Sequence, residues 1–443
     1  MGARFRRFVV AASVVATGAL GASAIEVVPA GGPAAVAAQA AAPSALLAPL
    51  PGWRPSLRPM FNDPGRRGSR VILRRILQAI RHTPRGETIR IATYSLDRPE
   101  VTYALRQARR RGAHVQVIVN KRTSSGLVFA LQRAFGKNPH RANFVVTCPG
   151  RCRGPGDGGN QHIKIASFTR TGGARDVIIG SSGNLTSKAT YRQWNDSWAI
   201  AYDPKVFNAW VGFFDQMKIQ RQRGPRGFLT TSQPGVKHAY SLWLQRTPAT
   251  ASAVQAPVAR AGHDPVVQRI NDVGCRTRRG YGTADGRTIV RITEYAVFKS
   301  RGVRVANAIA GLKRRGCDVM VIGSVFSRPV IGILRRAGVP LRMGDWRFAN
   351  RNPAEEDGLS GWGPRFYVHF KEMAVNGSFR GQPTKSVWTG SENWSPISFA
   401  NEEVVVRFTD PAYYTAYTRQ FRNLWRGRAT HRPGIDPTGG PPR

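Results

Sequence analysis

The sequence predicts an α/β fold of two tandem, pseudo-symmetric α/β-sandwich domains, with mixed, largely parallel sheets flanked by helices. Two observations lead to this prediction. Residues 89–96 (IRIATYSL) and 290–297 (VRITEYAV) are similar, and both alternate polar and apolar residues as a half-buried strand does. Each is followed by a helical stretch and a second apolar strand, an order typical of a βαβ unit with parallel strands.

The later elements of the repeat follow in the same order in each copy. The helical stretch ends in a basic cluster and a glycine, at 109–112 and again at 313–316. Glycine suits a helix C-cap, and cations suit the negative end of the helix dipole. The second strand is expected at 115–119 and at 319–322.

Both ends of the chain differ in composition from the repeats. A basic start is followed by an apolar run over 8–20 and by Ala22-Ser23-Ala24, a pattern typical of a cleaved signal peptide. A membrane anchor is the alternative, but the run is short for a bilayer span. We expect a secreted, extracellular protein. Its segments are a signal peptide at 1–24, a flexible leader at 25–52, an N-terminal half at 53–246, a linker at 247–262, a C-terminal half at 263–427 and a disordered tail at 428–443.

The four cysteines agree with an oxidising compartment. Cys148 and Cys152 flank a Pro-Gly-Arg turn that can bring them within bridging distance, which leaves Cys275 to pair with Cys317. A zinc site of four thiolates is the alternative, but the chain has no Cys-x-x-Cys pair. The sequence therefore predicts two disulfides and no metal or cofactor.

The chain carries a formal charge of +42, and loss of residues 1–24, with three arginines and no acidic residue, leaves +39. Such a charge attracts anionic surfaces, whether lipid headgroups, teichoic acids or nucleic acid. Arginine outnumbers lysine by 56 to 11 and is spread along the whole chain, so a GC-rich genome explains the charge equally well. Charge alone does not select the partner.

A second set of repeated residues carries the candidate chemistry. The motif His-Ile-Lys at 162–164 returns as His-Phe-Lys at 369–371, and in each half an asparagine turn and a carboxylate follow. The candidate catalytic residues are His162, His369, Lys164, Lys371, Asp196 and Glu402, and the candidate phosphate-binding residues are Asn184, Asn393, Ser182 and Ser391.

These residue types suit the cleavage of a phosphodiester. Lysine ammonium and asparagine amide groups can donate to the non-bridging oxygens, where the transition state spreads its negative charge. One histidine attacks phosphorus as a neutral imidazole, and the other must start protonated to release the leaving oxygen. We expect Asp196 and Glu402 to orient the two histidines, and the reaction requires no metal.

In these motifs the chain resembles the phospholipase D superfamily, whose signature is His-x-Lys, four residues, Asp, and then Gly-Ser-x-Asn. The resemblance covers about residues 60–427 and is closest at 390–393 (GSEN). It implies that two copies meet on a pseudo-twofold axis to build one site, so that no partner chain is needed. It further implies a phosphohistidine on His162, with His369 as acid and then base, and it allows an acid of one half to orient the histidine of the other.

The chain departs from the signature where the family has its aspartates. Thr169 and Asn376 stand at these two positions, and the first turn reads Ser-Ser-Gly-Asn. Threonine and asparagine can still form hydrogen bonds there, but without a charge. We expect them to support the strand and loop of their own motif.

The sequence favours hydrolysis of phospholipid headgroup phosphodiesters, with transfer to alcohols as an extension, by an enzyme in peripheral contact with anionic membrane. A secreted, metal-independent nuclease is the first alternative, because phosphate contacts dominate nucleic-acid affinity. However, the aromatic residues are not interleaved with basic ones as in a stacking platform. A catalytically weak protein that binds anionic cell-surface polymers is the second alternative.

Overall fold

The computed structural model describes residues 52–64, 67–153, 159–221, 228–232, 240–245, 264–352 and 361–433. The predicted signal peptide, almost all of the predicted leader and the predicted linker lie outside these residues. Within them, none of the helices is long and apolar enough to span a membrane.

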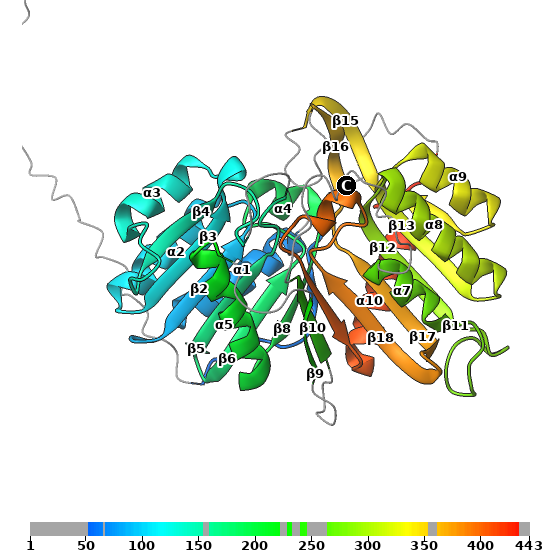
Figure 1. Cartoon of the computed structure of the whole chain (residues 1–443), viewed down its shortest axis with the longest axis horizontal. Helices are drawn as coiled ribbons and strands as arrows, with labels where there is room; N and C mark the ends of the chain where they lie inside the picture. Colours follow the sequence, from blue (N-terminus) through cyan, green and yellow to red (C-terminus); the bar gives the residue numbers. More distant parts are fainter. Residues whose placement is uncertain are drawn as a thin grey trace, which may run out of the picture. The chain divides into compact units, whose positions relative to one another are not determined.

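Two mixed sheets organise the described part of the chain (Figure 1). The first sheet has the order β1 (Met60–Phe61), β8 (Asp196–Ile200), β6 (Ala174–Ser181), β5 (Ile165–Thr171), β2 (Thr88–Thr93), β3 (His114–Asn120) and β4 (Phe144–Cys148). The second has the order β14 (Leu341–Met343), β13 (Asp318–Phe326), β12 (Ile289–Val297), β17 (Glu372–Phe379), β18 (Gln382–Gly390), β19 (Val404–Phe408), β10 (Tyr240–Gln245) and β9 (Phe228–Ser232), with β11 (Val273–Gly274) beside β17.

The predicted mixed α/β architecture is confirmed, and the repeat extends to strand pairing. Strand β2 pairs in parallel with β3 and antiparallel with β5, and β12 pairs in the same two ways with β13 and β17. The parallel part is smaller than predicted, because it is confined to β2–β3–β4 and β12–β13–β14 within these two sheets. Short turns join β5 to β6 and β17 to β18, and such turns require antiparallel neighbours.

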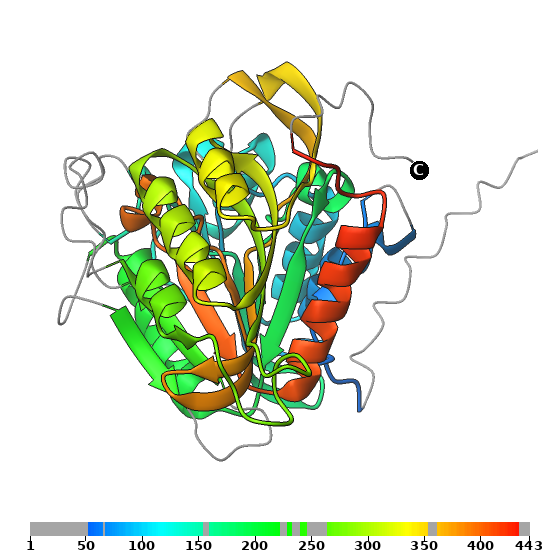
Figure 2. The ribbon, with the colours of Figure 1, turned by 90° about the vertical axis from the view of Figure 1, so that its right-hand side faces the viewer.

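Helices cover both faces of each sheet. The first sheet carries α1 (Val71–Arg81), α2 (Pro99–Arg110) and α3 (Gly126–Phe135) on one face and α5 (Pro204–Lys218) on the other. The second carries α7 (Pro265–Asn271), α8 (Lys299–Arg314) and α9 (Arg328–Arg336) on one face and α10 (Pro411–Arg426), drawn in red at the right of Figure 2, on the other. Helices α2 and α8 are each followed by a glycine with a φ of +89°, Gly112 and Gly316, which is the left-handed C-cap that the sequence predicts.

One hydrophobic core joins the two halves. It contains Trp198 and Ile200 from the first sheet, Val404 and Val406 from the second, and residues of α5 and α10. A third, small sheet also crosses between the halves, because β16 (Gly361–Val368) pairs with both β15 (Asp345–Asn352) and β7 (Gln193–Trp194). Each half therefore supplies backbone that supports the other.

Both predicted disulfides are present, with Cα atoms 5.1 Å apart in Cys148–Cys152 and 4.6 Å apart in Cys275–Cys317. No thiolate remains for the alternative zinc site, since all four cysteines lie in the described residues and are bridged. The first residues of the predicted disordered tail are ordered, because His431 exchanges two backbone hydrogen bonds of 2.8 Å with Met343 of β14. Residues 434–443 lie outside the described part.

Candidate active site

The two His-x-Lys motifs lie at the seam between the halves. His162 and His369 are fully buried, and Lys164 and Lys371 are 4% exposed. The backbone N–H of His162 donates to the Glu402 carbonyl (3.2 Å), and that of His369 donates to the Trp194 carbonyl (2.9 Å). Each histidine is thus held by backbone from the opposite half.

The histidine side chains are also oriented across the seam. His162 Nδ1 lies 2.9 Å and 3.0 Å from the two carboxylate oxygens of Glu403, and His369 Nδ1 lies 2.8 Å from Asn195 Oδ1. A carboxylate can only accept, and the Asn195 amide nitrogen donates to the Ala189 carbonyl, so Oδ1 accepts. Both histidines therefore carry a proton on Nδ1, and Nε2 of His369 lies 3.3 Å from Lys371 Nζ.

The predicted orienting residues, Asp196 and Glu402, are wrong by one position in each half. Asp196 accepts from Thr389 Oγ1 (2.5 Å) and from the Tyr417 hydroxyl (2.6 Å), and Glu402 forms a buried ion pair with Arg153 (2.8 Å). Successive side chains of an extended chain point to opposite faces. Asn195 and Glu403 therefore face the histidines while their neighbours face away.

The sequence does contain a trace of the correct pairing. The histidines repeat at an offset of 207 residues and the turn asparagines at 209. Asn195 and Glu403 are related by 208, between these two values, whereas Asp196 and Glu402 are related by 206, outside them. This pairing does not stand out as a repeat, because Asn195 carries an amide and Glu403 a carboxylate.

The two turn serines support the orienting residues, which corrects their predicted phosphate-binding role. Ser182 Oγ donates to Asn195 Oδ1 (3.2 Å), and Ser391 Oγ donates to Glu403 Oε2 (2.5 Å). Each hydroxyl also accepts a backbone N–H at 3.0 Å from the strand that follows. Both serines are fully buried and act through the side chains that hold the histidines.

The turn asparagines lie beside these serines. Asn184 is 6% exposed and Asn393 is fully buried. Neither polar atom of the Asn393 side chain has a hydrogen-bond partner among the described residues. Its amide can therefore donate to an oxygen of a bound substrate without breaking a protein contact.

Thr169 and Asn376, at the family's aspartate positions, bind the ends of neighbouring segments. Thr169 donates to Glu87 (2.6 Å) and accepts from the Thr88 N–H (2.8 Å), and Asn376 accepts from the Gly282 N–H (3.1 Å). These hydrogen bonds fix the strands that carry the motifs. They require no charge on residue 169 or residue 376, so these contacts form without the aspartates.

Aromatic rings complete the surroundings of the histidines. Tyr94 lies 5.5 Å from His162 between ring centroids, and Tyr295 and Tyr367 lie 4.6 Å and 5.7 Å from His369. Tyr94 and Tyr295 are equivalent residues of the repeated strands, a correspondence that is visible in the sequence. The sequence does not reveal their place beside the histidines, because strands also contain aromatic residues that only pack in the core.

The electrostatics of the site differ between the two histidines. Burial alone would raise the pKa of Glu403, but His162, Lys164 and the Ser391 hydroxyl together hold that pKa below its ordinary value. Glu403 therefore places a full negative charge beside Nδ1 of His162, whereas Asn195 places only a neutral amide oxygen beside Nδ1 of His369. This asymmetry gives the two histidines different surroundings, because the Glu403 carboxylate can stabilise a positive charge that develops on the His162 ring.

A buried carboxyl behind the second motif gives a prediction on stability. Burial, with the charge of Asp196, raises the pKa of Glu372 well above its ordinary value, although Thr293 donates to it at 3.1 Å. Above the ordinary pKa the unfolded chain loses this proton and the folded chain keeps it. Stability then falls with rising pH by about 1.4 kcal/mol per pH unit, until the pH passes the raised pKa.

We expect Glu372→Gln to remove this part of the pH dependence and to stabilise the fold near neutral pH. Urea unfolding at about pH 5 and about pH 8 measures it, because the variant should gain on the wild type as the pH rises. Glu87→Gln, at a partly exposed position, is the matched control. An equal slope in wild type and Glu372→Gln would contradict the prediction.

One part of the chain matches a known protein family. Residues 76–218 match the family model described as cardiolipin synthase, phospholipase D-like domain. No curated protein sequence matches the chain.

A solved structure with a similar fold spans both halves of the chain. Phosphatidylserine synthase of Haemophilus influenzae has a TM-score of 0.53 at 13% identity, covering 84% of this chain and 87% of its own. Polyphosphate kinase of Porphyromonas gingivalis has a TM-score of 0.48 at 13% identity, covering 86% of this chain, which spans 53% of the kinase. Nuc, a phospholipase D family member from Salmonella typhimurium, covers 38% of this chain and 88% of its own, with 19% identity and a TM-score of 0.25.

Proposed function

We propose that this chain is a secreted phospholipase D-type phosphodiesterase that hydrolyses phospholipid headgroups through a phosphohistidine intermediate and can transfer the phosphatidyl group to alcohols. The observation that carries this proposal is the exchange of orienting residues, Glu403 onto His162 and Asn195 onto His369, across the seam. One site with two differently polarised histidines suits a two-step displacement at phosphorus.

In the first step, His162 Nε2 attacks phosphorus and the bond to the headgroup oxygen breaks. Glu403 stabilises the positive charge that develops on the imidazole. His369 gives its Nε2 proton to the departing oxygen. Because its partner Asn195 is neutral, protonated His369 gives up this proton more readily than it would beside a carboxylate. Lysine and asparagine donors from each half bind the non-bridging oxygens.

In the second step, water attacks the phosphohistidine. His369 takes a proton from that water and returns to its starting state, while the bond between phosphorus and His162 Nε2 breaks. An alcohol in place of water would give a phosphatidyl alcohol by the same path. The two steps use no group from outside the chain other than the substrate and the attacking water or alcohol.

The preference for lipid over nucleic acid is based on the expected export, the two disulfides, which suit an oxidising compartment, and a basic chain that can sit on anionic membrane. The same charge of +42 also suits a nuclease or a binder of anionic polymers. These alternatives differ from the proposal in product rather than in site.

The test offers phosphatidylcholine vesicles and plasmid DNA, side by side and in chelator, to the chain from residue 25 onward. We expect choline release that both His162→Ala and His369→Ala abolish, and a mixed lipid-alcohol product when ethanol is added. DNA cleavage with intact lipid would assign a nuclease. Binding of anionic polymer without any turnover would assign the binding protein, and activity lost in chelator would overturn the metal-independent reaction.

A further inference from the structure

A buried arginine in the second half binds the turn that presents Asn393. Arg301 lies near the start of α8 and is fully buried. Its guanidinium donates to both carboxylate oxygens of Asp264 (3.0 Å each), to Glu392 (2.7 Å), to the Asn393 carbonyl (3.1 Å) and to the Ser395 carbonyl (3.3 Å). Five hydrogen bonds use all five N–H groups of the fork.

The partners of Arg301 are themselves fixed. Asp264 caps α7 by accepting the Val266 N–H at 3.0 Å, and its pKa is lowered because Arg301 outweighs the effect of burial. The guanidinium carbon also lies 4.0 Å from the centroid of the Phe399 ring. Arg301 therefore joins the starts of two helices to one short turn.

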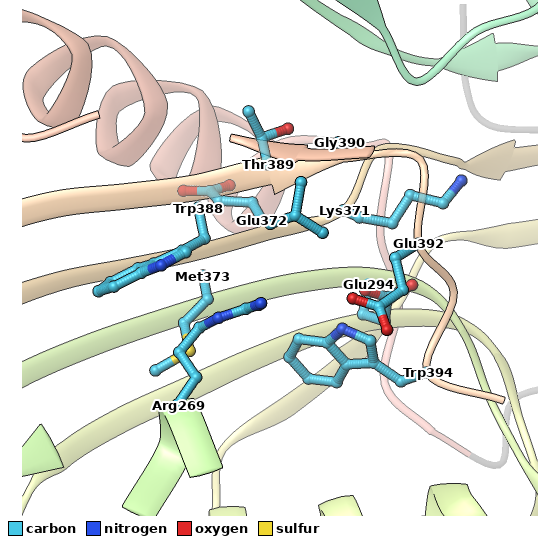
Figure 3. A pocket seen from close by; sticks show the side chains of 11 residues that line it. Arg269, Glu294, Lys371, Glu372, Met373, Trp388, Thr389, Gly390, Glu392 and Trp394 are labelled. Atoms are coloured by element: carbon cyan, nitrogen blue, oxygen red, sulfur yellow. The ribbon is translucent and has the colours of Figure 1, made fainter. Parts of the chain in front are cut away.

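Figure 3 shows how the turn meets the catalytic lysine. Glu392 and Glu294 lie close to Trp394, and Lys371 lies beside them in the same pocket. The backbone N–H of Trp394 donates to the Ala296 carbonyl at 3.0 Å, on the strand that carries Glu294. The backbone of Asn393 is thus held on one side by β12 and on the other by Arg301.

We infer that Arg301 is a positioning residue for the reaction, which fixes the backbone of Asn393 so that its side-chain amide faces the substrate phosphate. The Asn393 amide has no protein partner among the described residues, so its direction depends on the backbone that Arg301 holds. This inference rests on the proposed function and adds to it a residue that no motif contains.

The arrangement is specific to the second half. At the offset of 201 residues that relates β2 to β12, the counterpart of Arg301 is Glu100. Glu100 forms ion pairs with Arg70 (3.0 Å) and with Arg98, nearer the surface. The turn with Asn184 is therefore held in a different way, and the sequence repeat alone gives no hint of Arg301.

A double-mutant cycle separates positioning from general stability. Asn393→Ala is expected to lower kcat/KM by about 10²–10³-fold, as loss of one transition-state donor does. Arg301→Lys keeps the charge but loses the fork, and we expect a loss of about 10²-fold. If Arg301 acts through Asn393, adding Arg301→Lys to Asn393→Ala costs less than about twofold more. A full second loss in the double variant would overturn the inference.

Two further variants provide a replacement for Arg301→Lys and a control. Glu392→Ala removes one of the four groups that bind Arg301, so the cycle can be repeated with it if Arg301→Lys does not fold. Arg291→Met is the matched control, because Arg291 pairs with Asp318 (2.7 Å) at the start of β12, away from the turn. It is expected to leave kcat/KM unchanged.

Inorganic phosphate separates this inference from the proposed function. If the wild type turns over no lipid, the proposed function fails, but phosphate binding can still be followed by the rise in Tm that it causes. Arg301→Lys and Asn393→Ala should each reduce the rise in Tm. The double variant should reduce it no further than the single variant with the larger effect does. An unchanged rise in Arg301→Lys, or additive losses in the double variant, would overturn the positioning role.

Discussion

Replacing His162 by alanine is expected to prevent formation of any phosphorylated enzyme, while replacing His369 leaves the first step intact for a substrate that needs no acid. A p-nitrophenyl phosphodiester is such a substrate, because p-nitrophenolate leaves without a proton. In His369→Ala the phosphohistidine should then form in a burst and persist, since no base activates water. We expect turnover to fall by at least about 10⁴-fold in both variants, but with a burst in only one.

The measurement is stopped-flow release of nitrophenolate, followed by intact mass after an alkaline quench, which preserves phosphohistidine. The expected result is one burst equivalent and one added phosphoryl group with its remaining ester in His369→Ala, and neither in His162→Ala. His140→Ala, at an exposed histidine, is the control. A burst in His162→Ala and none in His369→Ala would reverse the roles, and no burst in either would argue against a covalent intermediate.

The sequence predicts the architecture well because the evidence for it is duplicated. The strands at 89–96 and 290–297 and the two His-x-Lys motifs each have a partner about two hundred residues away, so chance similarity is a poor explanation. Local chemistry also suffices for one disulfide, since a five-residue segment with a Pro-Gly turn brings Cys148 and Cys152 together, and the other two cysteines remain as the second pair.

The parts that the sequence does not predict depend on contacts between the halves. Choosing between Asp196 and Asn195 requires knowing which side of a strand faces the opposite half, and a one-residue shift reverses that answer. The Arg153–Glu402 pair joins residues 249 apart, and Arg301 reaches Asn393 from a helix outside every motif. Such contacts follow from tertiary packing, so neither composition nor spacing reveals them.

Exchanging charge between the two orienting residues should move the two limbs of the pH–rate profile in opposite senses. Glu403→Gln keeps an acceptor for His162 but removes the anion, so we expect kcat to fall by about 10²–10⁴-fold. The acid limb should shift to lower pH, because a neutral partner makes His162 easier to deprotonate. Glu403 itself does not set that limb, since its lowered pKa keeps it ionised until the pH falls below the ordinary range of glutamate.

Asn195→Asp is the reciprocal change and should shift the alkaline limb to higher pH. A carboxylate beside His369 stabilises its protonated form, so the acid survives to higher pH but gives up its proton less readily, and kcat at neutral pH should fall. Asp196→Asn is the matched control, because Asp196 binds Thr389 and Tyr417 rather than a histidine. It should alter stability and leave both limbs in place. If Asp196→Asn moved a limb while Glu403→Gln and Asn195→Asp moved none, the histidines would not be oriented across the seam during turnover, and the proposed division of roles would fail with them.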